Sequence, residues 1–443
     1  MQRDVKQGLE KASQGEKRAP GGWNAAVTLT EHWLARAERV DALLEGLAPG
    51  LSAQERARAQ QLFYGVVRWS SRIEAALDGL MTHAPRTKVR AVLLVAGFEL
   101  LEGGADLTAK VVHHAVEKAK TVASPKEARL VNAVARKMAD RLAIKPADLA
   151  TELAHPQWLV ARWTTQLGAE STRKLLEWNQ RPAPVHARWR IDAAVPEFLA
   201  PTKWAGFYEV KAGQWDEIRR LANEGALYLQ DPSTRLSIEL LAPQPGETIL
   251  DACAAPGGKS LFIADTMKTG KVIALDLPAR AGESSASGKA DVRLVRLKEN
   301  LSRAPQGVQV ALVEADLRSA GSVFYRNLNL PESYDAVLLD APCSNTGVMR
   351  HRVDVKWRLQ DGDFARHAEQ QLAMLHAAAQ LVKSGGRLVY STCSVDAEEN
   401  EGVIKAFFDS RAGGPWKLER SIRALPWIDG HDGAGAFLLV RKS

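Results

Sequence analysis

The pattern of apolar and polar residues changes along the chain near residue 246. Between about residue 23 and residue 143, apolar side chains recur every three or four positions, as at Leu62, Phe63, Val66 and Val67. That is the spacing of one buried helix face. Breaks fall at Ala48-Pro-Gly, Ala84-Pro-Arg, Glu102-Gly-Gly and Ser124-Pro. We therefore predict roughly five to seven helices in a compact all-α domain over residues 23–145.

From residue 246 onward, short apolar runs alternate with helical periodicity. The candidate strands are Thr248–Ala252, Val272–Leu277, Val308–Glu314, Ala336–Leu339, Arg387–Ser391 and Phe437–Arg441, and the clearest candidate helices are Phe364–Val382 and Glu398–Phe408. Alternating β and α elements are typical of a doubly wound, mostly parallel sheet. The sequence therefore predicts an α/β, Rossmann-like domain over residues 231–443.

Two further segments have less regular patterns. Residues 1–22 are polar and end in glycines, which is typical of a flexible tail. Residues 146–230 combine helical periodicity from Pro156 to Trp178 with a short apolar run at Val185–Ile191. We interpret residues 146–230 as a small connecting α+β subdomain.

The composition excludes several classes of protein. Of the 443 residues, 46% are hydrophobic and 25% are charged, as in ordinary globular proteins. The sequence has no apolar run long enough to span a membrane. Its three cysteines cannot form a disulfide framework, so we expect a cytoplasmic location. No Cys/His cluster has zinc spacing, so we expect no metal, and a monomer is the default expectation.

The positive charge is concentrated in the first third of the chain. Residues 1–145 contain 23 Lys and Arg against 16 Asp and Glu, whereas the remaining residues contain 36 of each sign. An excess confined to one region predicts a polyanionic partner for that region. A set of solvated helices is the alternative interpretation.

A glycine-rich loop follows the first predicted strand, within the segment Asp251-Ala-Cys-Ala-Ala-Pro-Gly-Gly-Lys-Ser260. Small residues there allow a ligand to approach the backbone closely. Cys253 occupies the place of the first glycine in the loop that binds nucleotide triphosphates, which argues against an ATPase. The Gly-x-Gly-x-x-Gly pattern is absent as well.

Carboxylates end three consecutive predicted strands, at Asp251, Asp276 and Asp316. The second carboxylate lies where a ribose diol is usually held, and the third is suited to accept a hydrogen bond from an adenine amino group. Phosphates would be repelled by these charges. The pattern therefore favours S-adenosylmethionine over NAD or ATP.

The other two cysteines follow the next two predicted strands, in Asp340-Ala-Pro-Cys343-Ser and Ser391-Thr-Cys393-Ser. The longer segments around them, Tyr334–Gly347 and Tyr390–Asn400, together with Asp251–Lys259 and His351–Arg358, resemble the motifs of the RNA cytosine-5 methyltransferases of the NOL/NOP/Sun family. The helical region is similar to NusB-like RNA-binding domains through Tyr64–Arg68 and Leu130–Arg136. The resemblance covers nearly the whole chain and is weakest in residues 1–22 and 192–225.

The resemblance implies the roles of individual residues. Cys393 would be the nucleophile that adds to carbon 6 of cytosine, and Cys343 would assist release of the product. Asp340 would hold the base at nitrogen 3, and Lys259 would either orient the base or favour the thiolate. The implied cofactor contacts are Cys253, Ala254, Ala255, Pro256, Gly257, Gly258, Lys259, Asp276, Asp316 and Asp340. The base that removes the carbon-5 proton is not identified by the sequence.

The pairing of these two domains implies small-subunit (16S) ribosomal RNA as the substrate, with transfer RNA as the closest rival. A catalytically idle RNA-binding or ribosome-assembly factor is a third hypothesis, although both thiols and Asp340 are present. A DNA methyltransferase would use the Pro-Cys343 thiol as its nucleophile.

Candidate phosphate contacts are Arg68, Arg136 and Lys137. The chain departs from the family pattern by an insertion over residues 278–291, which we interpret as a surface loop.

Overall fold

The computed structural model describes residues 21–36, 39–47, 50–279, 291–319 and 330–443. The chain divides into two compact units, which we call the helical unit and the sheet unit. The helical unit comprises residues 1–180 and Arg352–Arg358, and the sheet unit comprises residues 181–351 and 359–443. The predicted insertion over 278–291 lies mostly outside the described residues.

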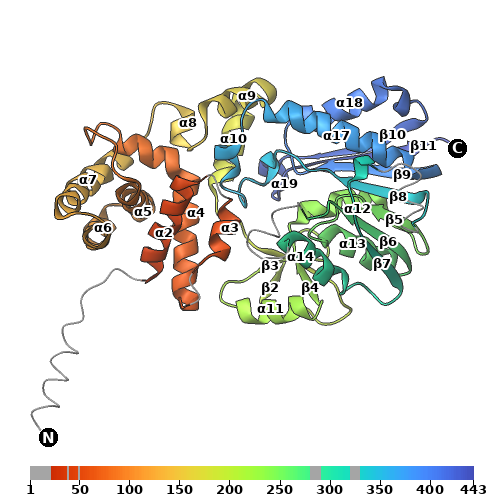
Figure 1. The fold of residues 1–443 in the computed structure, drawn as a ribbon, viewed down its shortest axis with the longest axis horizontal. Coiled ribbons are helices and arrows are strands. Elements are labelled where there is room, and N and C mark those ends of the chain that lie inside the picture. Colours follow the sequence, from red (N-terminus) through yellow and green to blue (C-terminus); the bar gives the residue numbers. More distant parts are fainter. Residues whose placement is uncertain (1–20, 37–38, 48–49, 280–290, 320–329) are drawn as a thin grey trace, which may run out of the picture. The chain divides into compact units, whose positions relative to one another are not determined.

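The helical unit is built around one apolar helix, α5 (Thr87–Gly103), which is buried on nearly all sides between Val89 and Leu100. Around it lie α2 (Gly21–Ala35), α4 (Ala53–Leu77), α6 (Thr108–Val122) and α7 (Pro125–Ala143) (Figure 1). The shorter helices are α3 (Val40–Glu45), α8 (Leu149–Glu152), α9 (Gln157–Leu167) and α10 (Ala169–Gln180). A helix that is apolar all round must be buried, which explains the central place of α5.

Local sequence signals set the helix starts in this unit. Ser52 and Ser124 each accept a hydrogen bond from the backbone N–H three residues later, while Glu55 and Glu127 bond back to the serine N–H groups. Such reciprocal caps satisfy two backbone donors that the helix itself leaves unpaired. The predicted breaks at residues 84–86, 102–104 and 124–125 are confirmed as helix boundaries, whereas the predicted break at residues 48–50 lies largely outside the described residues.

Residues Arg352–Arg358, which include α16 (Val355–Arg358), belong to the helical unit although they follow the Cys343 loop in sequence. Val353 is buried in an apolar cluster with Phe63 and Val67 of α4. The Lys356 Nζ donates to the Arg68 carbonyl at 2.8 Å, and the Trp357 Nε1 donates to the Val67 carbonyl at 2.7 Å. One short segment thus binds α4 through both apolar packing and hydrogen bonds.

The sheet unit contains a seven-stranded sheet in the order β10-β11-β9-β8-β5-β6-β7. The five parallel strands are β5 (Thr248–Asp251), β6 (Gly270–Asp276), β7 (Val308–Glu314), β8 (Tyr334–Asp340) and β9 (Val382–Thr392). Strands β11 (Ala434–Arg441) and β10 (Trp416–Ala424) are antiparallel to their neighbours. The predicted α/β fold with a mostly parallel sheet is therefore confirmed.

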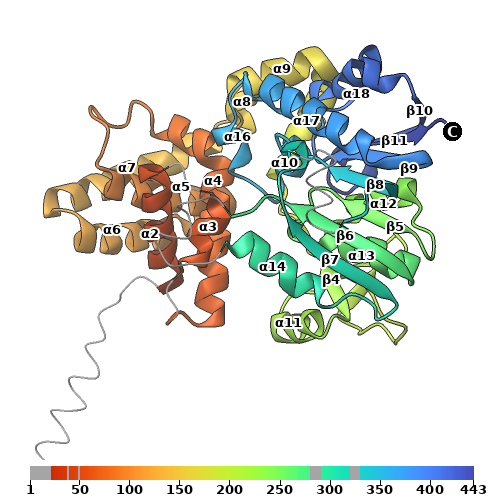
Figure 2. The same cartoon turned by 45° about the vertical axis from the view of Figure 1, so that its right-hand side comes forward.

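Helices cover both faces of this sheet (Figure 2). Alternate residues of a strand point to opposite faces, so Val337 and Leu339 pack with α17 (Asp363–Gln380) and α18 (Glu401–Asp409). Ala336 and Leu338 pack with α12 (Arg235–Leu241) and α13 (Gly258–Met267). Helix α14 (Val292–Leu301) packs beside α13. Burial on both faces explains why the central strands read as continuous apolar runs.

A second, four-stranded sheet has the order β2-β3-β1-β4, with β1 (His186–Trp189), β2 (Leu199–Pro201), β3 (Phe207–Val210) and β4 (Leu227–Leu229). Helix α11 (Trp215–Asn223) covers it. Arg188 and Arg190 of this segment pair with Asp265 of α13 at 2.7 and 2.8 Å. Among the described residues, no helix has the length and apolar character that a membrane crossing requires.

Candidate active site

The carboxyl ends of β5, β6, β8 and β9 meet at one edge of the main sheet, because neighbouring parallel strands run in the same direction. That edge holds Asp251, Asp276, Asp340 and the Cys393 loop. The structure therefore brings together residues that are distant in the sequence. Two adjoining cavities open at this edge.

The first cavity, of about 190 Å³, lies over the glycine-rich loop. Its lining residues are Tyr228, Leu229, Gln230, Thr234, Cys253, Ala254, Ala255, Pro256, Gly258, Lys259 and Asp340. Gly257 has a φ of +105°, and a Cβ on Gly258 would lie 2.6 Å from the Tyr228 ring. The two glycines are thus required for the turn and for the approach of the Tyr228 ring.

Carboxylates surround the thiol of Cys253. Burial and then the charges of Asp276, Asp251, Asp340 and Asp316 hold the pKa of this thiol well above its usual range. Cys253 therefore remains a neutral thiol, and the negative field around it favours a positively charged ligand.

Asp276 and Asp316 are held by neighbouring residues. Asp276 accepts hydrogen bonds from the Ala255 N–H at 2.7 Å and the Leu277 N–H at 2.8 Å, and it pairs with Arg293. Asp316 pairs with Arg318 at 2.7 Å, and hydrogen bonding to Arg318 lowers the pKa of its carboxyl. Asp276 thus fixes the glycine-rich loop directly. Neither Asp276 nor Asp316 is among the residues that line the first cavity.

The second cavity, of about 100 Å³, lies beside the first and shares Thr234, Lys259 and Asp340 with it. Its other lining residues are Asp231, Ser233, Leu236, Ser237, Val348, Ser391, Thr392, Cys393, Asp432, Ala434, Gly435 and Ala436. Cys393 therefore faces a separate space from the glycine-rich loop. Gln230 and Asp231 line the first and the second cavity, respectively.

Lys259 and Asp340 form an ion pair of 2.5 Å where the two cavities meet. Burial alone would lower the pKa of Lys259, but the charge and the hydrogen bond of Asp340 outweigh it, aided by the charge of Cys393, and raise it. The other oxygen of Asp340 accepts from the Ser391 hydroxyl at 2.9 Å. Lys259 thus remains a cation close to both Asp340 and Cys393.

The Sγ atoms of Cys343 and Cys393 lie 3.2 Å apart. Asn345, whose φ is +62°, donates its Nδ2 to the Cys343 carbonyl at 2.7 Å, and its Oδ1 accepts from the Cys393 thiol at 3.4 Å. Since the carbonyl only accepts, the amide orientation of Asn345 is fixed. Asn345 was not among the predicted site residues, because its role depends on a partner 48 residues away.

Backbone hydrogen bonds join the two cysteine loops. The Gly347 N–H donates to the Cys393 carbonyl at 2.9 Å, and the Gly433 N–H donates to the Gly347 carbonyl at 2.9 Å. A Cβ on Gly347 would lie 2.5 Å from the Gly433 oxygen and 2.7 Å from the Cys393 oxygen. The close approach of these segments therefore requires glycine at position 347.

A buried polar network lies beneath the thiols and is centred on Glu399 of the 3-10 turn η5 (Ala397–Glu399). Its carboxylate accepts hydrogen bonds from Ser344 and Ser394, the residues that follow the two cysteines. The sequence prediction missed this residue. The one available signal was its place in the Tyr390–Asn400 motif.

The Asp231, His351 and Asp432 side chains form the one described group whose ligand atoms are close enough for a metal, within 4.8 Å of one another. Arg350 lies close by, and the charges of Asp432 and Asp231 oppose the lowering of its pKa by burial. The guanidinium already supplies positive charge to these carboxylates. We therefore interpret the group as an ion-pair network.

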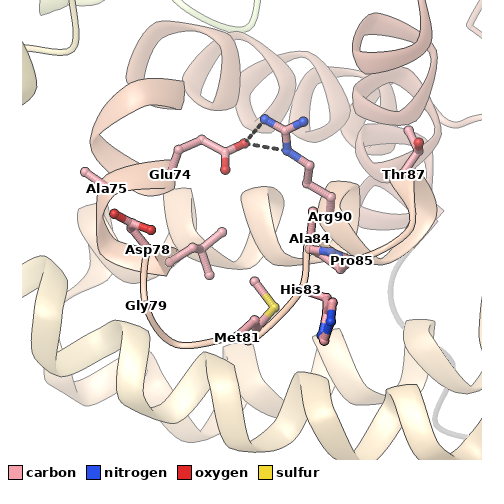
Figure 3. A pocket seen from close by; sticks show the side chains of 11 residues that line it. Glu74, Ala75, Asp78, Gly79, Met81, His83, Ala84, Pro85, Thr87 and Arg90 are labelled. Atoms are coloured by element: carbon pink, nitrogen blue, oxygen red, sulfur yellow. Dashed lines mark hydrogen bonds and ion pairs between the residues drawn. The ribbon is translucent and has the colours of Figure 1, made fainter.

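A cavity of about 600 Å³ lies in the helical unit, between the end of α4 and the start of α5 (Figure 3). Glu74 and Arg90 point toward each other across it, with the Arg90 Nε donating to Glu74 at 2.7 Å. No predicted site residue lines it.

Of the predicted phosphate contacts, Arg136 and Lys137 are exposed. Arg68 is only 8% exposed, so its side chain is not available to a phosphate.

Comparison with known proteins identifies the family. Residues 238–421 match the model of the 16S rRNA methyltransferase RsmB/F family, and residues 23–140 match the NusB family. The chain is 35% identical over 381 residues to the probable ribosomal RNA small subunit methyltransferase B of Bacillus subtilis (strain 168), covering 81% of this chain and 80% of that protein. The chain belongs to the RsmB/F family.

Solved structures agree with this RsmB/F fold. The crystal structure of PH0851 has a TM-score of 0.75 at 23% identity and covers 95% of this chain and 98% of its own. NSun6 from Pyrococcus horikoshii, solved with SFG, has a TM-score of 0.52 at 20% identity, covering 65% and 98%. Family membership confirms the predicted resemblance and the prediction that the chain is an enzyme, a methyltransferase.

Proposed function

We propose that this RsmB/F-family protein transfers a methyl group from S-adenosylmethionine to carbon 5 of a cytosine in small-subunit ribosomal RNA, through a covalent bond between Cys393 and carbon 6. The observation that carries the proposal is the pair of thiols 3.2 Å apart, with Cys393 lining the cavity that adjoins the glycine-rich loop across Lys259 and Asp340.

The chemistry explains why a thiolate is needed. Carbon 5 of cytosine is a weak nucleophile. When the Cys393 sulfur bonds to carbon 6, the electron pair of the 5,6 double bond moves toward carbon 5, which would then take the methyl group as the sulfur–methyl bond of S-adenosylmethionine breaks and S-adenosylhomocysteine leaves. Loss of the carbon-5 proton then re-forms the double bond and expels the Cys393 thiolate. In this proposal, Asp340 and Lys259, which line the same cavity as Cys393, bind the ring and favour this addition.

The first cavity suits a sulfonium cofactor. S-adenosylmethionine supplies the methyl group as a cation, and the carboxylates around the Cys253–Lys259 loop provide a complementary negative field. The structural neighbour NSun6 was solved with SFG, an analogue of this cofactor. In this proposal, the ribose and the adenine extend beyond the first cavity toward Asp276 and Asp316, respectively, because neither carboxylate lines that cavity.

The comparisons favour ribosomal RNA over the rival substrates, and the charge of the chain favours a nucleic acid in general. The family match names 16S rRNA methyltransferases, and a relative that covers most of the chain bears the corresponding name. The excess of basic residues in 1–145 suits a phosphate backbone. Because sulfur must reach ring carbon 6 from the face, the target cytosine must be unstacked or single-stranded.

A denaturing-gel assay for protein–RNA adducts tests this proposal. Wild type, Cys343→Ala and Cys393→Ala are each incubated with S-adenosylmethionine and either small-subunit ribosomal RNA or transfer RNA. We expect an adduct to accumulate in Cys343→Ala, since product release is impaired, and to be absent in Cys393→Ala.

Each alternative has its own outcome in this assay. An adduct only in Cys393→Ala would make Cys343 the nucleophile. An adduct only with transfer RNA would replace the proposed substrate. Binding of RNA without adduct or methyl transfer in any sample would favour an RNA-binding or assembly factor.

A further inference from the structure

Glu399 is a fully buried carboxylate beneath the two thiols, with 0% of its surface exposed. We propose that Glu399 is a positioning residue that ties the two cysteine loops together and, by its charge, keeps Cys343 protonated so that the negative charge of the pair resides on Cys393. This inference rests on the proposed function for its catalytic meaning. Its geometry and its test do not depend on that function.

The hydrogen bonds of Glu399 reach both loops. Its Oε1 accepts from the Ser344 N–H at 2.8 Å and from the Gln371 Nε2 at 3.1 Å. Its Oε2 accepts from the Ser394 hydroxyl at 2.6 Å and from the Ser344 hydroxyl. Ser344 and Ser394 directly follow Cys343 and Cys393. One carboxylate therefore fixes the backbone next to both sulfur atoms.

The donors that reach Glu399 among the described residues are all neutral, so its charge is stabilised by hydrogen bonds and not by a cation. The single hydrogen of the Tyr390 hydroxyl is shared between the Glu399 backbone carbonyl at 2.6 Å and the Gln371 Oε1 at 3.0 Å. Burial raises the pKa of Tyr390 well above its usual range, so this neighbour stays neutral.

The two thiols face opposite charges. The hydrogen bond to Cys393, burial, and the charges of Cys393 and Glu399 together hold the pKa of Cys343 well above its usual range. On the other side, Lys259 interacts favourably with a negative Cys393. Asp340 lines the same cavity as Cys393, but its charge is paired with that of Lys259 at 2.5 Å. The arrangement favours a Cys343 thiol that donates its hydrogen to the Cys393 sulfur, and Cys393, while it is a neutral thiol, donates in turn to the Asn345 Oδ1.

The division of charge matters for the proposed reaction. Addition to carbon 6 needs one thiolate, while a second thiolate 3.2 Å away would repel it. A Cys343 that keeps its proton stabilises the Cys393 thiolate through a hydrogen bond. Glu399 touches no reacting atom in this scheme. It acts through Cys343 and through the spacing of the loops.

The test measures the titration of Cys343 directly, in the full chain and without RNA or cofactor. Cysteine carrying ¹³C at Cβ gives one NMR signal for each thiol, and the Cys393→Ala background removes the largest influence on Cys343. The compared variants are Cys393→Ala, Cys393→Ala/Glu399→Gln and Cys393→Ala/Ser394→Ala. Gln keeps the shape of Glu399 and loses its charge, whereas Ser394→Ala removes the hydrogen bonds of the Ser394 hydroxyl, including the one to Glu399, and keeps the charge.

We expect Glu399→Gln to lower the midpoint of the Cys343 titration by at least about one pH unit, a tenfold rise in thiolate at a given pH. Ser394→Ala should shift it by less than about 0.3 unit. A midpoint that is the same with Glu399→Gln, or beyond the titration range in both, would show that burial alone keeps Cys343 protonated, which overturns the proposal.

A second measurement connects this result with catalysis. In the otherwise wild-type chain, Glu399→Gln should lower kcat for methyl transfer at least about tenfold with little change in KM for RNA or cofactor. Equal losses in Glu399→Gln and Ser394→Ala would indicate a purely structural role. If wild type itself transfers no methyl group, the proposed function fails, while the titration still decides the role of Glu399.

Discussion

Lys259 and Asp340 meet at 2.5 Å on the border between the two cavities. Lys259 comes from the first turn of α13 and Asp340 from the end of β8, so the ion pair links the glycine-rich loop to the strand that leads into the Cys343 loop. A cofactor bound in the first cavity and a base bound in the second would therefore both lie next to this ion pair.

Replacing Lys259 by Met should strongly impair methyl transfer. The change removes the cation near Cys393 and leaves Asp340 without its partner, so we expect a loss of at least about 100-fold in kcat/KM. Initial rates with tritiated cofactor measure this loss. Lys405→Met is the matched control, because Lys405 pairs with Asp409 on the exposed face of α18. Comparable losses in both variants would contradict a specific role for Lys259.

The buried Asp251 should make stability depend on pH. Burial raises the pKa of its carboxyl to about 7, although a hydrogen bond from Ser260 opposes the shift. Because this value lies above the ordinary 3.8, the folded chain binds the proton more tightly than the unfolded chain. The resulting stabilisation is complete below about pH 4 and is lost as the pH rises through about 7, by at most about 4 kcal/mol.

Asp251→Asn removes this titration. We expect the stability of the variant relative to wild type to increase between about pH 5 and about pH 8, as measured by urea unfolding. Ser260→Ala keeps the carboxylate and should retain the pH dependence. A constant difference between Asp251→Asn and wild type over this range would show that Asp251 is ionised at every pH tested.

Gly347→Ala should separate the two cysteine loops. The added Cβ would meet two backbone oxygens at 2.5 and 2.7 Å, so we expect a loss of about 2 kcal/mol or more of stability together with loss of methyl transfer. Gly362→Ala is a suitable control, because a Cβ there meets nothing within 4 Å. Thermal unfolding and activity of both variants test the prediction, and an active Gly347→Ala would refute it.

Trp357→Phe should loosen the segment 352–358 in the helical unit. An aromatic ring is kept, although phenyl is smaller than indole, and the Val67 carbonyl loses its Nε1 donor at 2.7 Å, which we expect to cost about 1 to 2 kcal/mol locally. Amide hydrogen exchange in residues 353–358 should become correspondingly faster. In Trp215→Phe, where the ring is 48% exposed, exchange in this segment should not change.

Arg136 and Lys137 are exposed on α7 and should contribute to RNA binding through charge alone. Each change to Ala should weaken binding similarly for different RNA sequences and reduce the slope of log affinity against log salt by about one. Fluorescence anisotropy at several salt concentrations measures both effects. Slopes equal to that of wild type would place the RNA on another surface.

The strands of the main sheet were largely predictable, because residues such as Val337 and Leu338 face apolar layers on both sides. The exception is β10 (Trp416–Ala424), which was not predicted. It is an edge strand whose residues from Lys417 to Ser421 are exposed, so its sequence lacks the apolar run. The predicted helix Phe364–Val382 corresponds to α17, and the predicted Glu398–Phe408 begins later, at Glu401.

The candidate site was predictable where its chemistry is local. The glycine-rich loop and the two cysteine loops can each be recognised from a segment of about ten consecutive residues. Glu399 and Asn345 do not, since an acidic residue at a helix start usually caps it in solvent, and only the fold buries this one. The sequence also gave no indication that residues 352–358 pack on α4, because the hydrogen bonds of Lys356 and Trp357 span nearly 290 positions.

The same segment has a consequence for synthesis on the ribosome. The helical unit consists of two chain segments. The first ends at Gln180, and the second is Arg352–Arg358. At about 5–20 residues per second, Trp357 emerges roughly 10 to 35 s after Gln180. During that interval the surface of α4 that receives Val353 and Trp357 is available to other molecules in the cell. The nascent helical unit therefore matures only after most of the sheet unit has been translated.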